Sequence, residues 1–506
     1  MEQETTAVRN GGGMERRAAL SALCATAAFS FAAHGFLFAN EFFSHDSVSY
    51  FTYATGTTAF YTGIGRFLIP LYETVKGDVA APWLIGLLFI GWMTLAALLT
   101  ADLLRIRSTG GRILTCGLLC MNLALTLTGA TYIYCLDEYA LALCAAAAAA
   151  WCFDRGRWWL LAGLGALVVS LAVYQPYFTV ATALCLLTAM RRLTAGEGAG
   201  RVFRLGLRDL GLLAAGFVGY YGLWTALCAL LNVAKSRVEE SLLGTGLGGL
   251  LRLVLQANRE YADRLLDTGG VLGCFLPIVH VLLLALLVWR LITLVRDEML
   301  PVGNKVLLVV LVCLLPTALN AAAILMAGSD TQLMAFSGEL IYLLAVTGLE
   351  PAARCRWARP LRAAAACLLC CVLWQHVVYA NQVYMKKDLE KNATLALATR
   401  VLDRVETTEG YVPGETPVTF AGRLDENEYW NRGREAFADL EGTVGLWSDY
   451  AATYNLGRYL TDYLNAPLLW DTEADAANWP EVEAMPAFPA AGSVALVDGT
   501  VVVKLS

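Results

Sequence analysis

The sequence predicts a helical membrane protein, with a bundle of about eleven transmembrane helices followed by a small α/β domain. Of its 506 residues, 58% are hydrophobic and only 16% are charged, whereas soluble domains have about 25% charged residues. Apolar segments of about 18 to 25 residues recur along the chain, which is the length that crosses about 30 Å of hydrocarbon as a helix. After residue 381 a mixed pattern of helix and strand replaces them.

Residues 1–17 are polar and then basic, and a long apolar segment without a clear cleavage site follows them. We interpret residues 1–17 as a cytoplasmic tail and the following segment as a retained signal anchor. The membrane domain is expected over residues 18–381. Hydropathy places its spans near 18–39, 81–103, 113–133, 137–153, 158–174, 177–191, 209–232, 270–294, 305–327, 339–351 and 361–381.

The loop charges predict the orientation of these spans, because cytoplasmic loops collect Lys and Arg. With the N-terminus inside, every strongly basic short loop lies on the cytoplasmic side. These loops are 105–112, 154–157, 191–208, 296–305 and 353–362. An odd number of spans then places the tail, residues 382–506, outside the membrane.

Two tight connections on the outer side, YIYCLDEYA (132–140) and AVYQPYF (172–178), predict helical hairpins. Two longer outer loops cover residues 40–80 and 233–269. Within the second, residues 239–266 have apolar positions at helical spacing. They predict an amphipathic helix, either in the membrane interface or packed on the bundle.

The tail, residues 382–506, is predicted to form a separate small domain. Residues 386–406 predict a helix and PVTFAG (417–422) a strand. SVALVDGTVVVKLS (493–506) predicts a hairpin that turns at Asp498-Gly499. We therefore expect an extracytoplasmic α/β domain.

Composition excludes several classes of site. None of the fourteen cysteines lies beyond Cys371 and nearly all fall in or beside spans, so we interpret them as packing residues. The four histidines lack paired spacing, so no metal site and no cofactor is predicted, although a divalent cation is left open. The chain has no phosphate-binding or dinucleotide loop, and a net charge of −6 gives no case for nucleic acid.

The first outer loop contains the stretch FSHDSVSYFTYATGTTAFYTGIGRFL (43–68). A carboxylate such as Asp46 can take a proton from a sugar hydroxyl, and an arginine such as Arg66 can hold a phosphate in bidentate fashion. A structural ion pair between the two is the alternative. Aromatic residues beside Asp46, including Tyr50, could bind a sugar ring or form an aromatic belt in the membrane interface.

This loop, the later hairpin SLAVYQPYFTVA (169–181) and the small outer tail resemble the serotype-converting type II glucosyltransferase family. That family resembles the larger GT-C superfamily of membrane glycosyltransferases, which use polyprenyl-phosphate sugars. The resemblance spans roughly residues 30–350. It implies a GT-C-like membrane domain.

Residue by residue, the resemblance implies that Asp46 is the catalytic base. His45 stands where the family often has a second acid. Arg66 would contact the donor phosphate or brace the loop, and Asp137 and Glu138 would assist the base or bind sugar. The other residues expected to bind substrate are His45, Tyr50, Tyr174, Gln175, Tyr177, Arg252 and Arg259.

The implied enzyme is a hexosyltransferase of the bacterial plasma (inner) membrane. It would move a hexose, glucose by analogy, from an undecaprenyl-phosphate-linked donor to a hydroxyl of an envelope glycan or a lipid-linked saccharide on the outer face. A transporter or flippase of a lipid-linked sugar is the alternative, although transporters tend to show repeated halves. A non-catalytic envelope scaffold that presents the tail is a third interpretation.

Overall fold

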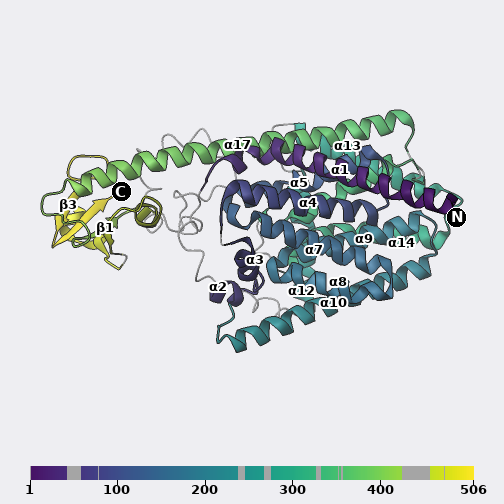
Figure 1. The fold of residues 1–506 in the computed structure, drawn as a ribbon, viewed down its shortest axis with the longest axis horizontal. Coiled ribbons are helices and arrows are strands. Elements are labelled where there is room, and N and C mark those ends of the chain that lie inside the picture. The colour runs from purple at the N-terminus through teal and green to yellow at the C-terminus, as the bar shows by residue number, and fades with distance from the viewer. Residues whose placement is uncertain are drawn as a thin grey trace.

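The computed structural model describes residues 2–42, 58–77, 79–236, 246–266, 275–325, 332–351, 353–354, 357–423, 456–471 and 473–506. Figure 1 shows a bundle of helices, from which one long helix, α17 (Arg359–Glu406), extends to a small sheet near the C-terminus. The N-terminus lies at the opposite end of the bundle.

Apolar helices of different lengths form the body of the bundle. They are α1 (Glu2–Ala39), α4 (Pro82–Leu103), α5 (Thr109–Cys120), α6 (Leu123–Thr131), α7 (Leu136–Arg155), α8 (Leu160–Val173), α9 (Phe178–Thr194), α10 (Ala199–Leu230), α13 (Phe275–Arg296), α14 (Val302–Leu319) and α16 (Tyr342–Leu349). Shorter elements are α2 (Thr58–Gly63), α3 (Ile69–Lys76), α15 (Ala321–Leu325) and the 3₁₀ turns η1 (Ile133–Cys135), η2 (Arg157–Trp159), η3 (Gln175–Tyr177), η5 (Gln332–Met334) and η6 (Phe336–Ile341).

Within the described residues, eight helical segments are long and apolar enough to cross a membrane. Two shorter apolar segments, Arg157–Val173 and Phe336–Leu349, fall where spans 158–174 and 339–351 were expected. The span expected at 177–191 corresponds to α9, which has 17 residues. A helical membrane bundle is therefore confirmed, and the count of eleven crossings stays a prediction.

Both predicted hairpin connections are tight. Tyr132 and the 3₁₀ turn η1 join α6 to α7, and Tyr174 and η3 join α8 to α9. Proline has no backbone N–H for a helical hydrogen bond, and Pro176 accordingly lies in the turn rather than in a helix. These turns, with α2 and α3, lie at the end of the bundle from which α17 leaves; we name it the α3 end (Figure 1).

Several short connections are tied together by charged side chains at the other end, which we name the arginine end. Asp102 forms ion pairs with Arg107 at 3.1 Å and with Arg155 at 2.6 Å, and Asp154 pairs with Arg192 at 2.6 Å. Further links are the hydrogen bond from Asn304 to the carbonyl of Glu197, the Arg354–Asp297 ion pair and the hydrogen bond from Arg107 N–H to Glu350. The basic loops seen in the sequence thus lie at one end.

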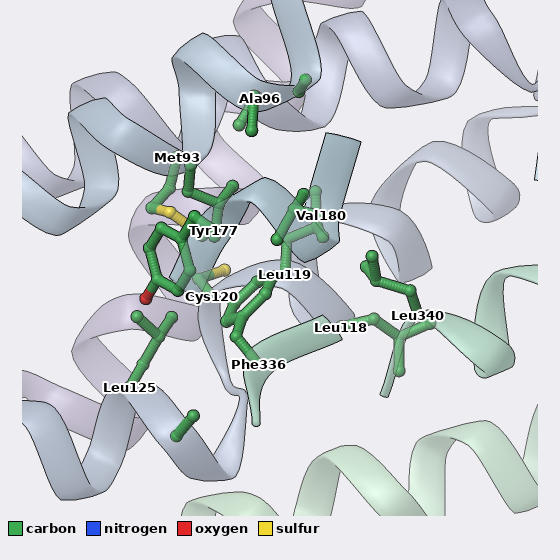
Figure 2. Packing of buried hydrophobic residues seen from close by; sticks show 14 of the residues in the cluster. Met93, Ala96, Leu118, Leu119, Cys120, Leu125, Tyr177, Val180, Phe336 and Leu340 are labelled. Atoms are coloured by element: carbon green, nitrogen blue, oxygen red, sulfur yellow. The ribbon is translucent and has the colours of Figure 1, made fainter. Parts of the chain in front are cut away.

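A break between α5 and α6 lets other segments reach the core. Asn122 caps α6 by accepting from Ala124 N–H, and its amide donates to the carbonyl of Phe336 in η6. A polar backbone segment at this depth is tolerated because its groups are satisfied inside the protein. Figure 2 shows the surrounding apolar packing, with Tyr177 and Phe336 among aliphatic side chains of α4, α5 and α6.

The helix α12 (Leu247–Leu266) confirms the helical part of the prediction for 239–266, and residues 239–245 lie outside the described residues. Its Ala257 and Tyr261 are buried, and Tyr261 donates a hydrogen bond to the carbonyl of Gly338 at 3.0 Å. The helix therefore packs on the bundle through one face.

The C-terminal sheet has four strands in the order β2-β1-β4-β3. β1 (Pro417–Ala421) runs parallel to β2 (Leu469–Trp470) and to β4 (Thr500–Lys504), and β3 (Val494–Val497) pairs with β4 in antiparallel register. The predicted hairpin turn is confirmed: Asp498 and Gly499 both have positive φ, as a tight type I′ turn requires.

Helix α17 is continuous across the boundary expected at residue 382. Its end packs on the sheet through Leu397, Val401 and Val405, which share an apolar cluster with Val418 and Val501. The helix predicted at 386–406 is confirmed, but it is the extension of the last apolar helix rather than a separate element. The domain limits 18–381 and 382–506 stay predictions.

Candidate active site

Two polar clusters meet at the α3 end of the bundle. The carboxylate cluster contains Asp137 and Glu138 with Lys76, and the arginine cluster contains Arg66 with Tyr139 and Tyr174. Because Asp137, Glu138 and Tyr139 are consecutive in the first turn of α7, the two clusters are continuous.

In the carboxylate cluster, Lys76 Nζ lies 3.2 Å from Asp137 Oδ1 and 3.6 Å from Glu138 Oε1. The lysine side chain is 2% exposed and both carboxylates are fully buried. Tyr72 donates its hydroxyl hydrogen to Asp137 Oδ2 at 3.0 Å and accepts a hydrogen bond from Trp92 Nε1 at 3.1 Å. Asp137 is therefore held from two sides by groups of α3.

Local sequence explains why these charges lie where they do. Helix α3 ends at Gly77, which takes the left-handed conformation with φ of 82° and leaves Lys76 in the last turn. Asp137 and Glu138 occupy the first turn of α7. The helix dipole favours a cation near a C-terminus and anions near an N-terminus, so each helix end stabilises the charge that it carries.

Acidic side chains outnumber basic ones in and beside this cluster. Glu73, one turn before Lys76, is 2% exposed and acts electrostatically on Glu138. Neither carboxylate oxygen of Glu138 has a hydrogen-bond partner among the described residues. Burial disfavours the charge on Lys76, but Asp137 and Glu138 outweigh that effect, so the pKa of Lys76 is raised above its ordinary value. Lys76 thus remains a cation.

In the arginine cluster, the guanidinium of Arg66 contacts two tyrosines. Its Nη1 donates to the Tyr139 hydroxyl at 2.8 Å, and its Cζ lies 5.7 Å and 5.0 Å from the ring centroids of Tyr139 and Tyr174. Those two rings stack with centroids 3.8 Å apart. Over the described part of the chain, no carboxylate forms an ion pair with Arg66, so its charge is met there by aromatic faces and neutral acceptors.

The turn that carries Arg66 is fixed by side chains from other elements. Gln175 Nε2 donates to the carbonyl of Ile64 at 2.7 Å, and Tyr220 donates its hydroxyl hydrogen to the carbonyl of Gly65 at 3.1 Å. Gly65 has φ of 79°, and a Cβ there would collide with the Tyr220 hydroxyl. Trp224 Nε1 donates to the carbonyl of Thr62 at 2.6 Å. This backbone therefore depends on α10 and η3.

The structure brings together six of the residues predicted for the site: Arg66, Asp137, Glu138, Tyr174, Gln175 and Tyr177. Gln175 also accepts from Arg66 Nε at 3.5 Å and bonds to Tyr220, so its amide positions the turn. The predicted residues His45, Asp46 and Tyr50 lie outside the described residues, as does the rest of segment 43–57.

Tyr177 borders the arginine cluster, because its ring centroid lies 4.9 Å from that of Tyr174 and 6.4 Å from that of Tyr139. Tyr177 is fully buried, its ring packs on Phe336 with centroids 5.5 Å apart, and its hydroxyl has no hydrogen-bond partner within the described ranges. This position favours packing over contact with a sugar. Arg252 and Arg259 are exposed on α12, and Arg259 pairs with Asp263 at 3.7 Å.

Sequence reasoning missed Lys76, Tyr72 and Tyr139 as members of the site. Lys76 lies in the same connection between α1 and α4 as Arg66, three residues after Glu73, so a count of the cations in that connection would have found it. Tyr139 directly follows the two predicted carboxylates. Tyr220 and Trp224 gave no local signal, because they are aromatic residues within an apolar helix and differ from core residues only in their partners.

No group of three or more His, Cys, Asp and Glu residues within the described ranges is arranged to hold a metal ion. In the carboxylate cluster, the position between Asp137 and Glu138 is filled by the ammonium group of Lys76.

Comparison with known proteins identifies the family. The model of the family described as glucosyl transferase GtrII matches residues 35–348, a range that includes both polar clusters. No curated protein and no solved structure is similar enough to the chain to match it. The match covers more than half of the chain and agrees with the resemblance seen in the sequence. The chain therefore belongs to the GtrII glucosyl transferase family.

Proposed function

We propose that the protein transfers glucose from an undecaprenyl-phosphate-linked donor to a hydroxyl of an envelope glycan or a lipid-linked saccharide, at the outer face of the bacterial inner membrane. The family supports glucosyl transfer, and the apolar helices support a membrane setting. The observation that carries the finer proposal is the continuity of the carboxylate cluster with the arginine cluster at one end of the bundle.

The charge distribution supports the outer face. The basic connections meet at the arginine end, and loops rich in Lys and Arg remain in the cytoplasm. The α3 end is the opposite end of the bundle, and the N-terminus lies with the arginine end (Figure 1). In this orientation the two polar clusters face outward.

The proposed roles follow from charge and placement. Arg66 contacts the donor phosphate, because a guanidinium can donate two parallel hydrogen bonds to phosphate oxygens and Arg66 has no carboxylate partner among the described residues. Asp46 is the general base, as the family resemblance implies. Asp137 and Glu138 bind sugar hydroxyls or assist the base, and Lys76 holds Asp137 in place.

In the proposed reaction the acceptor hydroxyl oxygen attacks the anomeric carbon of the donor sugar. A bond forms between that oxygen and the anomeric carbon, and the bond from this carbon to the phosphate oxygen breaks with its electron pair. Asp46 takes the hydroxyl proton, and polyprenyl phosphate leaves as an anion that Arg66 stabilises.

The test uses membranes containing the full chain, a labelled glucosyl polyprenyl phosphate and an acceptor glycan. We expect label on the acceptor together with released polyprenyl phosphate, and Asp46→Asn should lower transfer by about 100-fold or more. Asp137→Asn should also lower transfer. Arg259→Gln changes an exposed ion pair outside the clusters and serves as the control.

The outcomes separate this function from its rivals. Full transfer by Asp46→Asn would overturn the assignment of the base. A flippase would move the lipid-linked sugar between leaflets without releasing polyprenyl phosphate, so sugar movement with an intact donor would overturn the proposed transferase activity.

A further inference from the structure

A cavity of about 670 Å³ opens between α9, α13, α14 and α16 at the arginine end. Its walls are aliphatic, and they include Leu187, Leu287, Leu308, Val312 and Leu344. This volume is in the range of small-molecule sites, which are mostly apolar with few polar groups. The walls suit a hydrocarbon chain.

The polar rim of the cavity is positively charged. Arg105, Arg191, Arg290 and Arg354 line it together with a single carboxylate, Glu350. The Glu350 carboxylate already has hydrogen-bond donors: the N–H groups of Arg107 and Ser108 and the Ser108 hydroxyl. The carboxylate is thereby committed to the backbone and hydroxyl groups that precede α5.

Arg290 is a structural member of the rim. Its Nη1 donates to the carbonyl of Leu344 at 2.8 Å and to the Thr347 hydroxyl at 3.0 Å, and its Cζ lies 6.0 Å from the Trp357 ring centroid. This arginine fixes α13 to α16 and shapes the rim.

The other three arginines are held loosely. Arg105 lies 3.8 Å from Asp102, which already pairs with Arg155 at 2.6 Å, and the Arg105 side chain is half exposed. Arg354 lies 3.6 Å from Asp297, and its Nη1 has no hydrogen-bond partner among the described residues.

The guanidinium of Arg191 is in a similar position to that of Arg354. Its Nη2 lies 3.3 Å from Asp154, whose closer partner is Arg192 at 2.6 Å. Its Nε is buried and makes no hydrogen bond within the described part of the chain. The rim therefore holds guanidinium donors that a phosphate group could engage.

We propose that this cavity binds an anionic glycerophospholipid of the cytoplasmic leaflet, with its phosphodiester at Arg105, Arg191 and Arg354 and an acyl chain along the aliphatic walls. Arginine matches phosphate oxygens in a bidentate geometry, and basic pockets between membrane helices on the cytoplasmic side suit such headgroups. The site lies at the end of the bundle opposite Arg66 and Asp137, so it is distinct from the proposed transfer site.

The test measures lipid retained by the purified full-length protein in native mass spectrometry, with phosphatidylglycerol or phosphatidylcholine added. We expect preferential retention of phosphatidylglycerol, and the double variant Arg105→Gln, Arg354→Gln should lower that retention by about tenfold or more. The matched control removes the same charge at the same end through Arg201→Gln and Arg204→Gln, which lie on the exposed face of α10.

A second variant tests the same cavity in case the double arginine variant does not fold. Leu287→Trp fills the cavity without removing a charge, and it should also lower phosphatidylglycerol retention. Equal retention of phosphatidylcholine, unchanged retention in both cavity variants, or an equal loss in the control variant would overturn the proposal. Displacement of phosphatidylglycerol by an equimolar polyprenyl phosphate would overturn the assignment to a glycerophospholipid.

Discussion

Lys76 Nζ lies 3.2 Å from Asp137 Oδ1, and both side chains are buried although 61 residues separate them in the sequence. The ion pair joins the last turn of α3 to the first turn of α7. It thereby fastens the segment between α1 and α4 to the helical bundle, and it fixes the position of a carboxylate that the family resemblance places in the site.

Lys76→Met should destabilise the protein strongly. The substitution leaves Asp137 and Glu138 buried without their cation, and breaking a buried ion pair in this way costs about 3–5 kcal/mol. Thermal unfolding in detergent measures the effect. Arg259→Gln breaks an exposed pair and should cost less than about 1 kcal/mol. Equal melting temperatures for Lys76→Met and the native protein would contradict a stabilising role for the pair.

The stabilisation by Lys76 should persist through neutral and moderately basic pH. Because the pKa of Lys76 is raised in the folded state, its contribution is complete below the ordinary lysine value of 10.5 and is lost as pH rises through the folded value. The difference in melting temperature between the native protein and Lys76→Met should stay constant from about pH 7 to about pH 10 and narrow above that range. Narrowing near neutral pH would show that Lys76 loses its proton there.

Arg66→Lys should impair the enzyme although the charge is kept. An ammonium group cannot reproduce the planar fork of a guanidinium over two tyrosine rings, so we expect the KM for the lipid donor to rise by about tenfold. Arg66→Gln should have a larger effect. Steady-state transfer at varied donor concentration measures both. Arg252→Lys, at an exposed position of α12, is the control, and an unchanged KM in Arg66→Lys would argue against a phosphate contact.

Gly65→Ala should disturb the turn that carries Arg66. The residue has φ of 79°, and the added Cβ would meet the Tyr220 hydroxyl, so we expect a loss of about 1–3 kcal/mol in stability together with reduced transfer. Gly206→Ala is the matched control, since it lies within α10 with open space around it and should stabilise the helix by up to about 1 kcal/mol. If the two variants behaved alike, the turn would not require glycine.

The C-terminus should lie outside the cytoplasm. The basic connections at the arginine end predict that this end is cytoplasmic, and α17 leaves the bundle at the other end. Alkaline phosphatase fused after Ser506 should therefore be active, and a fluorescent protein fused at the same position should be dark. Fusions within loop 297–301 should give the opposite pair of results, and agreement between the two sites would contradict the predicted orientation.

Local patterns determined much of the fold. The length of the apolar segments predicted membrane helices, and Pro176 marked the break between α8 and α9. Asp498-Gly499 predicted the hairpin between β3 and β4 because their left-handed backbone suits a two-residue turn. The continuity of α17 beyond residue 382 could not be read from hydropathy, since a helix that leaves the membrane changes its surface composition but not its backbone hydrogen bonding.

For the site, the sequence by itself determined which residue types were available: Arg66 in the first loop and Asp137 and Glu138 after the second tight connection. Tertiary structure alone decided their partners. Lys76 forms an ion pair with Asp137. The Tyr220 hydroxyl donates a hydrogen bond to the carbonyl of Gly65, which is 155 residues away in the sequence. Such contacts depend on how separate helices pack side by side, and no local periodicity encodes that packing. The same packing left Arg252 and Arg259 on the exposed face of α12, although their charge alone had suggested a place in the site.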